Sequence, residues 1–218
     1  MALADVIINN QIQAFKRGSS GVYVPAHAQP DTNDFLVAQG LPAFTEMTRL
    51  GEGWATMATA AVAALVVRPP PVAALEIFNN ESVGGQSLIV DRIFSHWLVS
   101  TAVPGSATLY AMVTRPKAAP ADAALAINSL SGKAADTRTV LTAASTTVVD
   151  NGWFPWDSAF PPAQAAATVT PQGGIMSKVE GRLIVPPTCS LCLHVVANVV
   201  GNTFTSGASW YKQQLTLK

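Results

Sequence analysis

Residues 74–99 read ALEIFNNESVGGQSLIVDRIFSHWLV, and this stretch decides the fold class. Two apolar runs, at 74–78 and 87–99, are separated by a segment that contains an Asn pair and a Gly pair. Runs rich in β-branched and aromatic residues, bounded by Asn and Gly, are typical of strands joined by a turn. The stretch therefore predicts two consecutive β-strands.

Similar runs recur along the rest of the chain, with Gly, Pro or Asn between them, at a spacing of roughly 8–12 residues. They lie at 56–67, 108–115, 138–149, 181–185, 190–200 and 209–217. Short strands at this spacing, with no alternation of strands and long helices, predict an all-β protein built as an antiparallel β-sandwich. The interruption that we expect is one or two helical turns at 120–127.

The first fifty residues differ in pattern from the rest of the chain. Residues 7–13 alternate weakly, residues 18–21 are the flexible sequence GSSG, and residues 25–34 are rich in turn formers. Two interpretations are open: an extended arm with a short helix near 34–38, or a first strand followed by a long loop. The predicted organisation is an N-terminal arm or lead-in segment at 1–50 and a β-sandwich domain at 51–218.

Composition excludes several classes of protein. Thirteen basic and thirteen acidic side chains give a net charge of zero, which argues against nucleic acid or a membrane surface as a partner. Hydrophobic residues make up 49% of the chain and charged ones only 12%, so the chain folds and is expected to bury surface against partners. We expect neither a signal peptide nor a transmembrane segment, because the apolar runs are short or interrupted.

No motif in the sequence indicates catalysis. Cys189 and Cys192 lie near His194, but a zinc site would need a second pair of ligands. Residues three apart on a strand also point to opposite faces, which separates the two sulfurs. We therefore expect no enzymatic activity, no catalytic residue, no metal and no cofactor. The alternative is an enzyme whose acids and histidines converge only in three dimensions.

Three aromatic residues, Trp153, Phe154 and Trp156, lie close together in a segment that we predict to be a loop. Clustered aromatic side chains bury a large apolar area at low entropic cost, and so they mark protein interfaces and sugar-stacking sites. Three interpretations are open. The segment plugs an open end of the sandwich, contacts another protein, or stacks against a sugar.

Residues 74–80 and 84–94, together with RLIVPP at 182–187 and LCLHV at 191–195, resemble a β-hairpin style common in tailed-phage virion proteins. The resemblance implies a jelly-roll-like sandwich that decorates or builds a virus particle, commonly as a trimer. It carries over no functional residue, because such proteins work through their surfaces.

The expected function is therefore that of a bacteriophage capsid decoration, or cement, protein located in the virion. Its expected partners are its own copies and other virion proteins such as a major capsid protein. The alternative is a carbohydrate-binding β-sandwich, an adhesin or appendage module that uses Trp153, Phe154 and Trp156.

Overall fold

The computed structural model describes most of the chain. The described residues are 5–8, 11–17, 23–28, 35–36, 42–58, 60–99, 105–118, 126–133, 136, 138–149, 152–160 and 173–215, with the backbone alone before residue 42. The chain divides into two compact units, Met1–Ala43 and Phe44–Lys218, each of which is described by itself.

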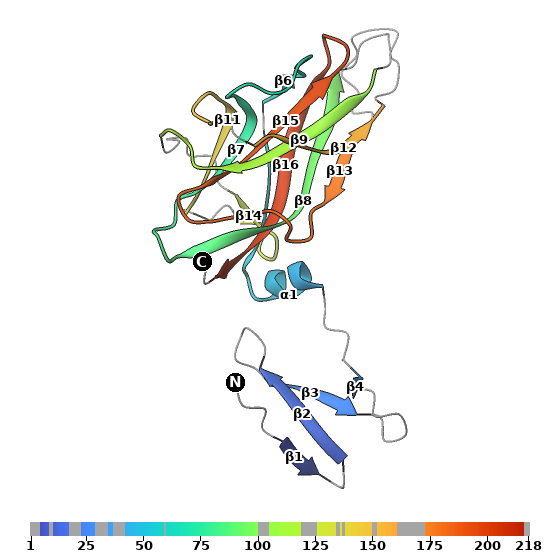
Figure 1. Cartoon of the computed structure of the whole chain (residues 1–218), viewed down its shortest axis with the longest axis vertical. Coiled ribbons are helices and arrows are strands. Elements are labelled where there is room, and N and C mark those ends of the chain that lie inside the picture. The colour runs from blue at the N-terminus through green and yellow to red at the C-terminus, as the bar shows by residue number, and fades with distance from the viewer. Residues whose placement is uncertain are drawn as a thin grey trace. The chain divides into compact units, whose positions relative to one another are not determined.

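The first unit contains four short strands. They are β1 (Asp5–Ile8), β2 (Gln11–Arg17), β3 (Tyr23–Ala28) and β4 (Phe35–Leu36). Each strand pairs antiparallel with the next one, which gives the order β1-β2-β3-β4 (Figure 1). The prediction of a short helix near 34–38 is wrong at Phe35 and Leu36, because these residues form β4 and pair with the edge of β3.

Helix α1 (Ala43–Arg49) leads into the second unit, which is otherwise built of strands. In chain order they are β5 (Gly53–Met57), β6 (Val62–Ala63), β7 (Ala73–Asn79), β8 (Gln86–Val99), β9 (Ala107–Thr114), β10 (Ile127–Asn128), β11 (Thr139–Ser145), β12 (Phe154–Ala159), β13 (Gly174–Lys178), β14 (Ile184–Val185), β15 (Ser190–Ala197) and β16 (Thr203–Gln214). No helix within these described ranges has the length and hydropathy needed to cross a bilayer.

These strands form two antiparallel sheets that pack against each other, which confirms the predicted β-sandwich (Figure 1). Sheet I has the order β10-β5-β16-β8-β13, with β14 also on β8 and β6 on β16. Sheet II has the order β11-β7-β15-β9-β12. Eight strands remain when β6, β10, β11 and β14 are left out. Numbered 1 to 8 along the chain, they give the order 1-8-3-6 in sheet I and 2-7-4-5 in sheet II, which is the strand order of a jelly roll.

The hydrophobic core lies between the two sheets. Its fully buried large side chains come from both inner faces and include Trp210, Phe204, Leu75, Ile77, Leu88, Ile93, Leu109, Leu191 and Leu193. A second, smaller cluster consists of Ala73, Met112, Val148, Trp153 and Cys192, which we call the outer cluster. Met112 on β9 and Cys192 on β15 are cross-strand partners, and the residues next to each of them in sequence belong to the main core. Because successive side chains of a strand point to opposite faces, the outer cluster lies on the outward face of sheet II.

Other predicted elements have different bounds in the structure or lie outside the described residues. The run at 56–67 forms two short strands, β5 and β6, rather than one. Strand β16 begins at Thr203, before the predicted run at 209–217, and continues through Ser206-Gly207, where it pairs with β8 and β5. Most of the helical segment predicted at 120–127 lies outside the described residues, while Ile127 belongs to β10.

Candidate functional site

Phe154 and Trp156 lie in β12, an edge strand of sheet II, and not in the predicted loop, whereas Trp153 lies in the segment directly before β12. Only 6% of Trp153 is exposed, whereas 65% of Phe154 is exposed. Trp156 is half-buried and packs against the main core. The three side chains therefore occupy three different environments, and a solvent-facing stacking surface would have only Phe154 among them.

Trp153 is part of the outer cluster, next to Met112 and Cys192. Its indole nitrogen donates a hydrogen bond of 3.2 Å to the carbonyl oxygen of Pro70. This contact ties the segment before β12 to the segment before β7. The segment before β12 thus lies against the outward face of sheet II, and Trp153 is a packing residue there.

Trp156 lies under an arginine at the open edge of the sandwich. The guanidinium carbon of Arg182 is 5.6 Å from the centre of the Trp156 ring, and the Phe154 ring stands nearly perpendicular to the Trp156 ring at 6.4 Å. Arg182 also donates hydrogen bonds of 3.1 and 2.9 Å to the carbonyl oxygens of Val179 and Lys178. These contacts fix the cation over the indole, which shields the edge of the core.

A buried carboxylate lies on the same face of sheet II as the outer cluster. Glu76 is fully buried and accepts hydrogen bonds from the hydroxyls of Ser145 and Ser190, the latter at 2.6 Å. Burial raises the pKa of the Cys192 thiol well above its usual value, and the charge of Glu76 raises it further. The Cys192 thiol therefore stays protonated and is a poor nucleophile.

The two cysteines lie on different sides of sheet II. Cys189 packs against the main core, whereas Cys192 belongs to the outer cluster, and both thiols are free. Burial also lowers the pKa of His194. Nowhere in the described part of the chain do three His, Cys, Asp or Glu side chains gather where they could hold a metal ion.

The outward face of sheet I carries an apolar surface that sequence reasoning missed. Met57, Gly207, Phe94 and Met176 are cross-strand neighbours on β5, β16, β8 and β13, and we call them the apolar row. The residues that flank Phe94 and Gly207 in sequence, Ile93 and Ala208 among them, point into the core, so the apolar row points outward. Met57 and Met176 are each 54% exposed.

Gly207 allows the Phe94 ring to lie across strand β16. A β-carbon at this position would lie 2.4 Å from Cζ of Phe94 and 2.4 Å from the carbonyl oxygen of Thr56, closer than such atoms can approach. A glycine inside a strand commonly marks such a close approach. The ring therefore lies low over the sheet and keeps the apolar row flat.

Gly207→Ala is expected to lower the free energy of unfolding by about 2 kcal/mol, because the added methyl group displaces the ring and meets a backbone oxygen that cannot move freely. Urea denaturation followed by tryptophan fluorescence measures this change. Gly152→Ala is the matched control, since nothing lies within 4 Å of its β-carbon position. Equal stabilities of the two variants would contradict the proposed contact.

The row next to the apolar row is basic. Arg92 on β8 pairs with Lys178 on β13 and with Ser209 on β16. The guanidinium of Arg92 lies 3.4 Å from the carboxylate of Asp91 and 3.9 Å from the sulfur of Met176.

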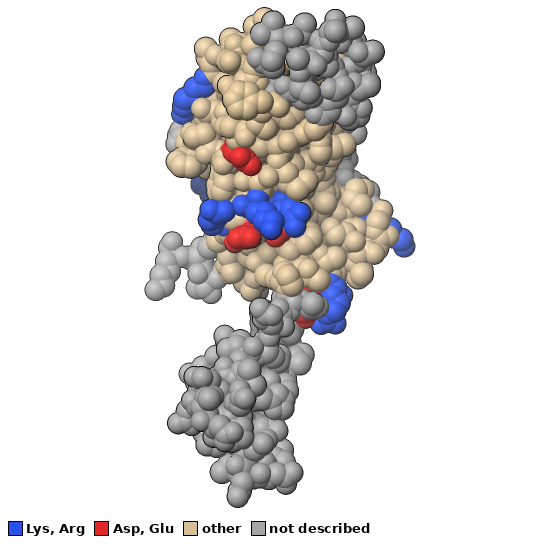
Figure 2. Space-filling view, turned by 90° about the vertical axis from the view of Figure 1, so that its right-hand side faces the viewer, with Lys and Arg blue, Asp and Glu red and all other residues tan. Residues whose placement is uncertain are grey.

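Figure 2 looks at the side of the sandwich that carries β12 and β13. It shows a short band of Lys and Arg side chains, with Asp and Glu beside it, on a surface of otherwise uncharged residues.

No protein-family model, no curated protein and no solved structure matches the chain.

Proposed function

We propose that this chain is a structural protein of a virus particle, a capsid decoration protein that works as a homo-oligomer through protein–protein surfaces. The apolar row on the outward face of sheet I is the observation that carries the proposal. Adjoining apolar side chains on the surface of a folded protein mark an area that another molecule covers, and here the exposed Met57 and Met176 adjoin the half-buried Phe94.

The composition and shape of this surface favour a protein partner. Aromatic residues, Met and Arg are enriched in protein interfaces, and the apolar row with Arg92 combines all three. Four neighbouring strands span about 14 Å at the usual strand spacing. A flat strip of this width suits another protein surface, whereas small molecules bind in concave sites.

The fold supports the same proposal by analogy only. Jelly-roll sandwiches serve as viral capsid domains, and they also occur in lectins and cupins, so the fold alone does not select a function. Closed cyclic symmetry is the usual arrangement of identical subunits. We propose a trimer, as the resemblance to tailed-phage virion proteins implies, located in the virion, with a major capsid protein as its further partner.

Size-exclusion chromatography with light scattering tests the assembly. The unmodified chain is expected to elute at three times its 22.7 kDa mass. The double variant Met57→Gln with Met176→Gln is expected to elute as a monomer, because it removes both exposed thioethers without entering the core. Leu130→Gln, which also changes a side chain that is 61% exposed, is the control and should remain a trimer. A monomeric unmodified chain, or a double variant that assembles normally, would contradict the role of the apolar row.

The particle itself provides the second test. Mass spectrometry of gradient-purified particles, produced from the genome that encodes the chain, is expected to detect it at a fixed ratio to the major capsid protein. Its absence from intact particles would exclude the decoration role and leave the assembly result standing.

A further inference from the structure

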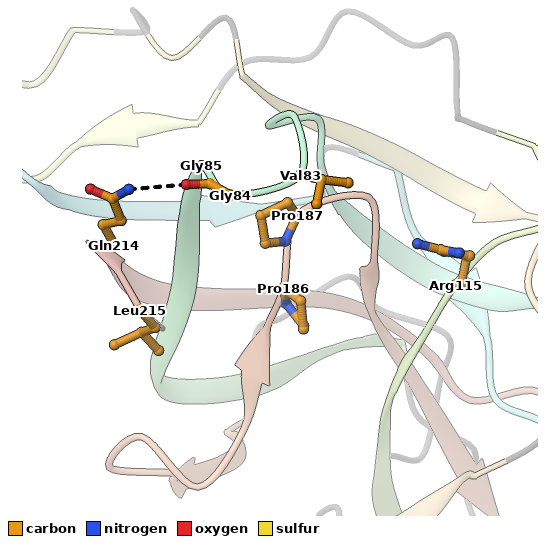
Figure 3. A pocket seen from close by; sticks show the side chains of 8 residues that line it. All are labelled: Val83, Gly84, Gly85, Arg115, Pro186, Pro187, Gln214 and Leu215. Carbon is orange, nitrogen blue, oxygen red and sulfur yellow. Dashed lines mark hydrogen bonds between the residues drawn. The ribbon is translucent and has the colours of Figure 1, made fainter. Parts of the chain in front are cut away.

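A pocket of about 450 Å³ lies beside the ends of several strands (Figure 3). Four segments that are distant in sequence meet there: the β7–β8 connection, the residue after β9, the residues after β14 and the end of β16. Its volume falls within the range of about 300–1,000 Å³ that is usual for small-molecule sites.

The walls of the pocket are largely apolar. They are formed by Val83 from the β7–β8 connection, Pro186 and Pro187 after β14, and Leu215 after β16. Figure 3 shows these side chains around the opening, with Arg115 on one side and Gln214 on the other. Of the described residues that line the pocket, Arg115 is the one with a charge.

Hydrogen bonds hold the walls together before any ligand enters. The Gln214 side-chain amide donates a bond of 3.0 Å to the carbonyl oxygen of Gly84. The Asn79 side chain, at the end of β7, donates to the carbonyl oxygens of Gln86 and Val185, at 2.9 and 3.1 Å, and so ties the end of β7 to the start of β8 and to β14. A pocket that is already ordered loses little conformational entropy when a ligand binds.

Arg115 retains donors that a ligand can use. One of its terminal nitrogens donates a hydrogen bond of 3.0 Å to the Thr188 hydroxyl, which positions the side chain beside the pocket. A guanidinium carries five N–H donors in a planar fork, which matches the two oxygens of a carboxylate. The pocket thus combines largely apolar walls with one cationic side chain that is oriented by a hydrogen bond to Thr188.

We propose that this pocket binds a carboxylate attached to a short apolar chain, with the carboxylate on Arg115 and the chain against Val83, Pro186 and Pro187. A free organic acid and the C-terminus of a polypeptide share this chemistry. The inference does not depend on the role of the chain in a particle.

Isothermal titration of the full chain tests the proposal with two probe pairs. The first pair is octanoate and octanamide, and the second is the peptide acetyl-Ala-Val-Leu with a free or an amidated C-terminus. Each acid is expected to bind at least about tenfold more tightly than its amide, as a charge-assisted hydrogen bond implies. The acid that binds more tightly identifies the source, a free acid or a polypeptide C-terminus.

Two variants connect the binding to the pocket. Arg115→Ala is expected to weaken binding of the acids by about tenfold. Val83→Glu adds a negative charge, the same sign as that of the acids, at a side chain that is 85% exposed. It should therefore weaken binding of the acids without unfolding the protein. Arg68→Ala removes the same charge from an exposed side chain before β7, beyond the opposite end of that strand, and should leave binding unchanged.

The proposal is overturned if acids and amides bind equally, or if Arg115→Ala binds the acids as tightly as the unmodified chain. It is also overturned if neither acid saturates the protein at about 20 mM, because even modest ligand efficiency gives a ligand of this size a millimolar Kd.

Discussion

Asp136→Ala is expected to lower the free energy of unfolding by about 3–5 kcal/mol, because it leaves a buried ammonium without its counterion. The Lys212 nitrogen lies 2.7 Å from the Asp136 carboxylate, and the two side chains are only 5% and 3% exposed. The same carboxylate accepts hydrogen bonds from the Thr139 hydroxyl at 2.5 Å and from the Arg138 backbone at 2.9 Å. Removing it therefore leaves several buried donors without an acceptor.

A double-mutant cycle measured by urea denaturation separates the pair from its surroundings. Adding Lys212→Met to Asp136→Ala is expected to recover part of the lost stability, because the uncompensated charge disappears. Glu46→Ala breaks the exposed ion pair of helix α1 and should leave the unfolding midpoint unchanged. Additive effects of the two buried substitutions would show that the ion pair does not couple them.

Trp153→Ala is expected to lower the free energy of unfolding by about 3–5 kcal/mol, the usual range for a buried aromatic side chain. Its ring fills the outer cluster, and the substitution also leaves the Pro70 carbonyl without its donor. Phe154→Ala is the adjacent control and should change stability by less than about 0.5 kcal/mol, because its side chain is mostly exposed.

Thermal and chemical denaturation, together with light scattering, decide between packing and assembly for these residues. An unstable Trp153→Ala variant confirms that the residue is part of the fold. A variant of unchanged stability that no longer assembles would instead place Trp153 in an interface, against the packing observed here. The same measurement on Phe154→Ala reports whether its exposed ring contributes to assembly.

The strands that could be predicted from sequence are those whose signal is local. Strands β8 and β9 lie within one residue of the predicted runs, because turn-forming residues bound a long apolar stretch. Strand β13 was missed, since its five residues carry a weak apolar pattern. The Ser206-Gly207 pair is a turn signal on its own, but β16 continues through it because this segment pairs with β8 and β5 on its two sides.

The candidate surfaces depend on contacts that the sequence cannot show. Met57, Phe94 and Met176 are far apart in the chain, and only strand register places them in one row. The opposite holds for Trp153 and Phe154, which are neighbours in sequence although 6% of the first and 65% of the second is exposed. Their closeness in sequence therefore predicted one aromatic cluster, whereas neighbouring side chains of an extended chain point to opposite faces.

The strand order has a consequence for synthesis of the protein on the ribosome. Strand β16 lies between β5 and β8, and β15 lies between β7 and β9, so the central strand of each sheet is translated after both of its neighbours. At about 5–20 residues per second, the interval from β5 to the end of β16 lasts roughly 10–30 s. During that time β5, β7, β8 and β9 lack their central partners, and their unpaired edges can join other nascent chains. Completion of each sheet thus waits for β15 or β16, and the period before that strand is available is when the chain is most exposed to aggregation.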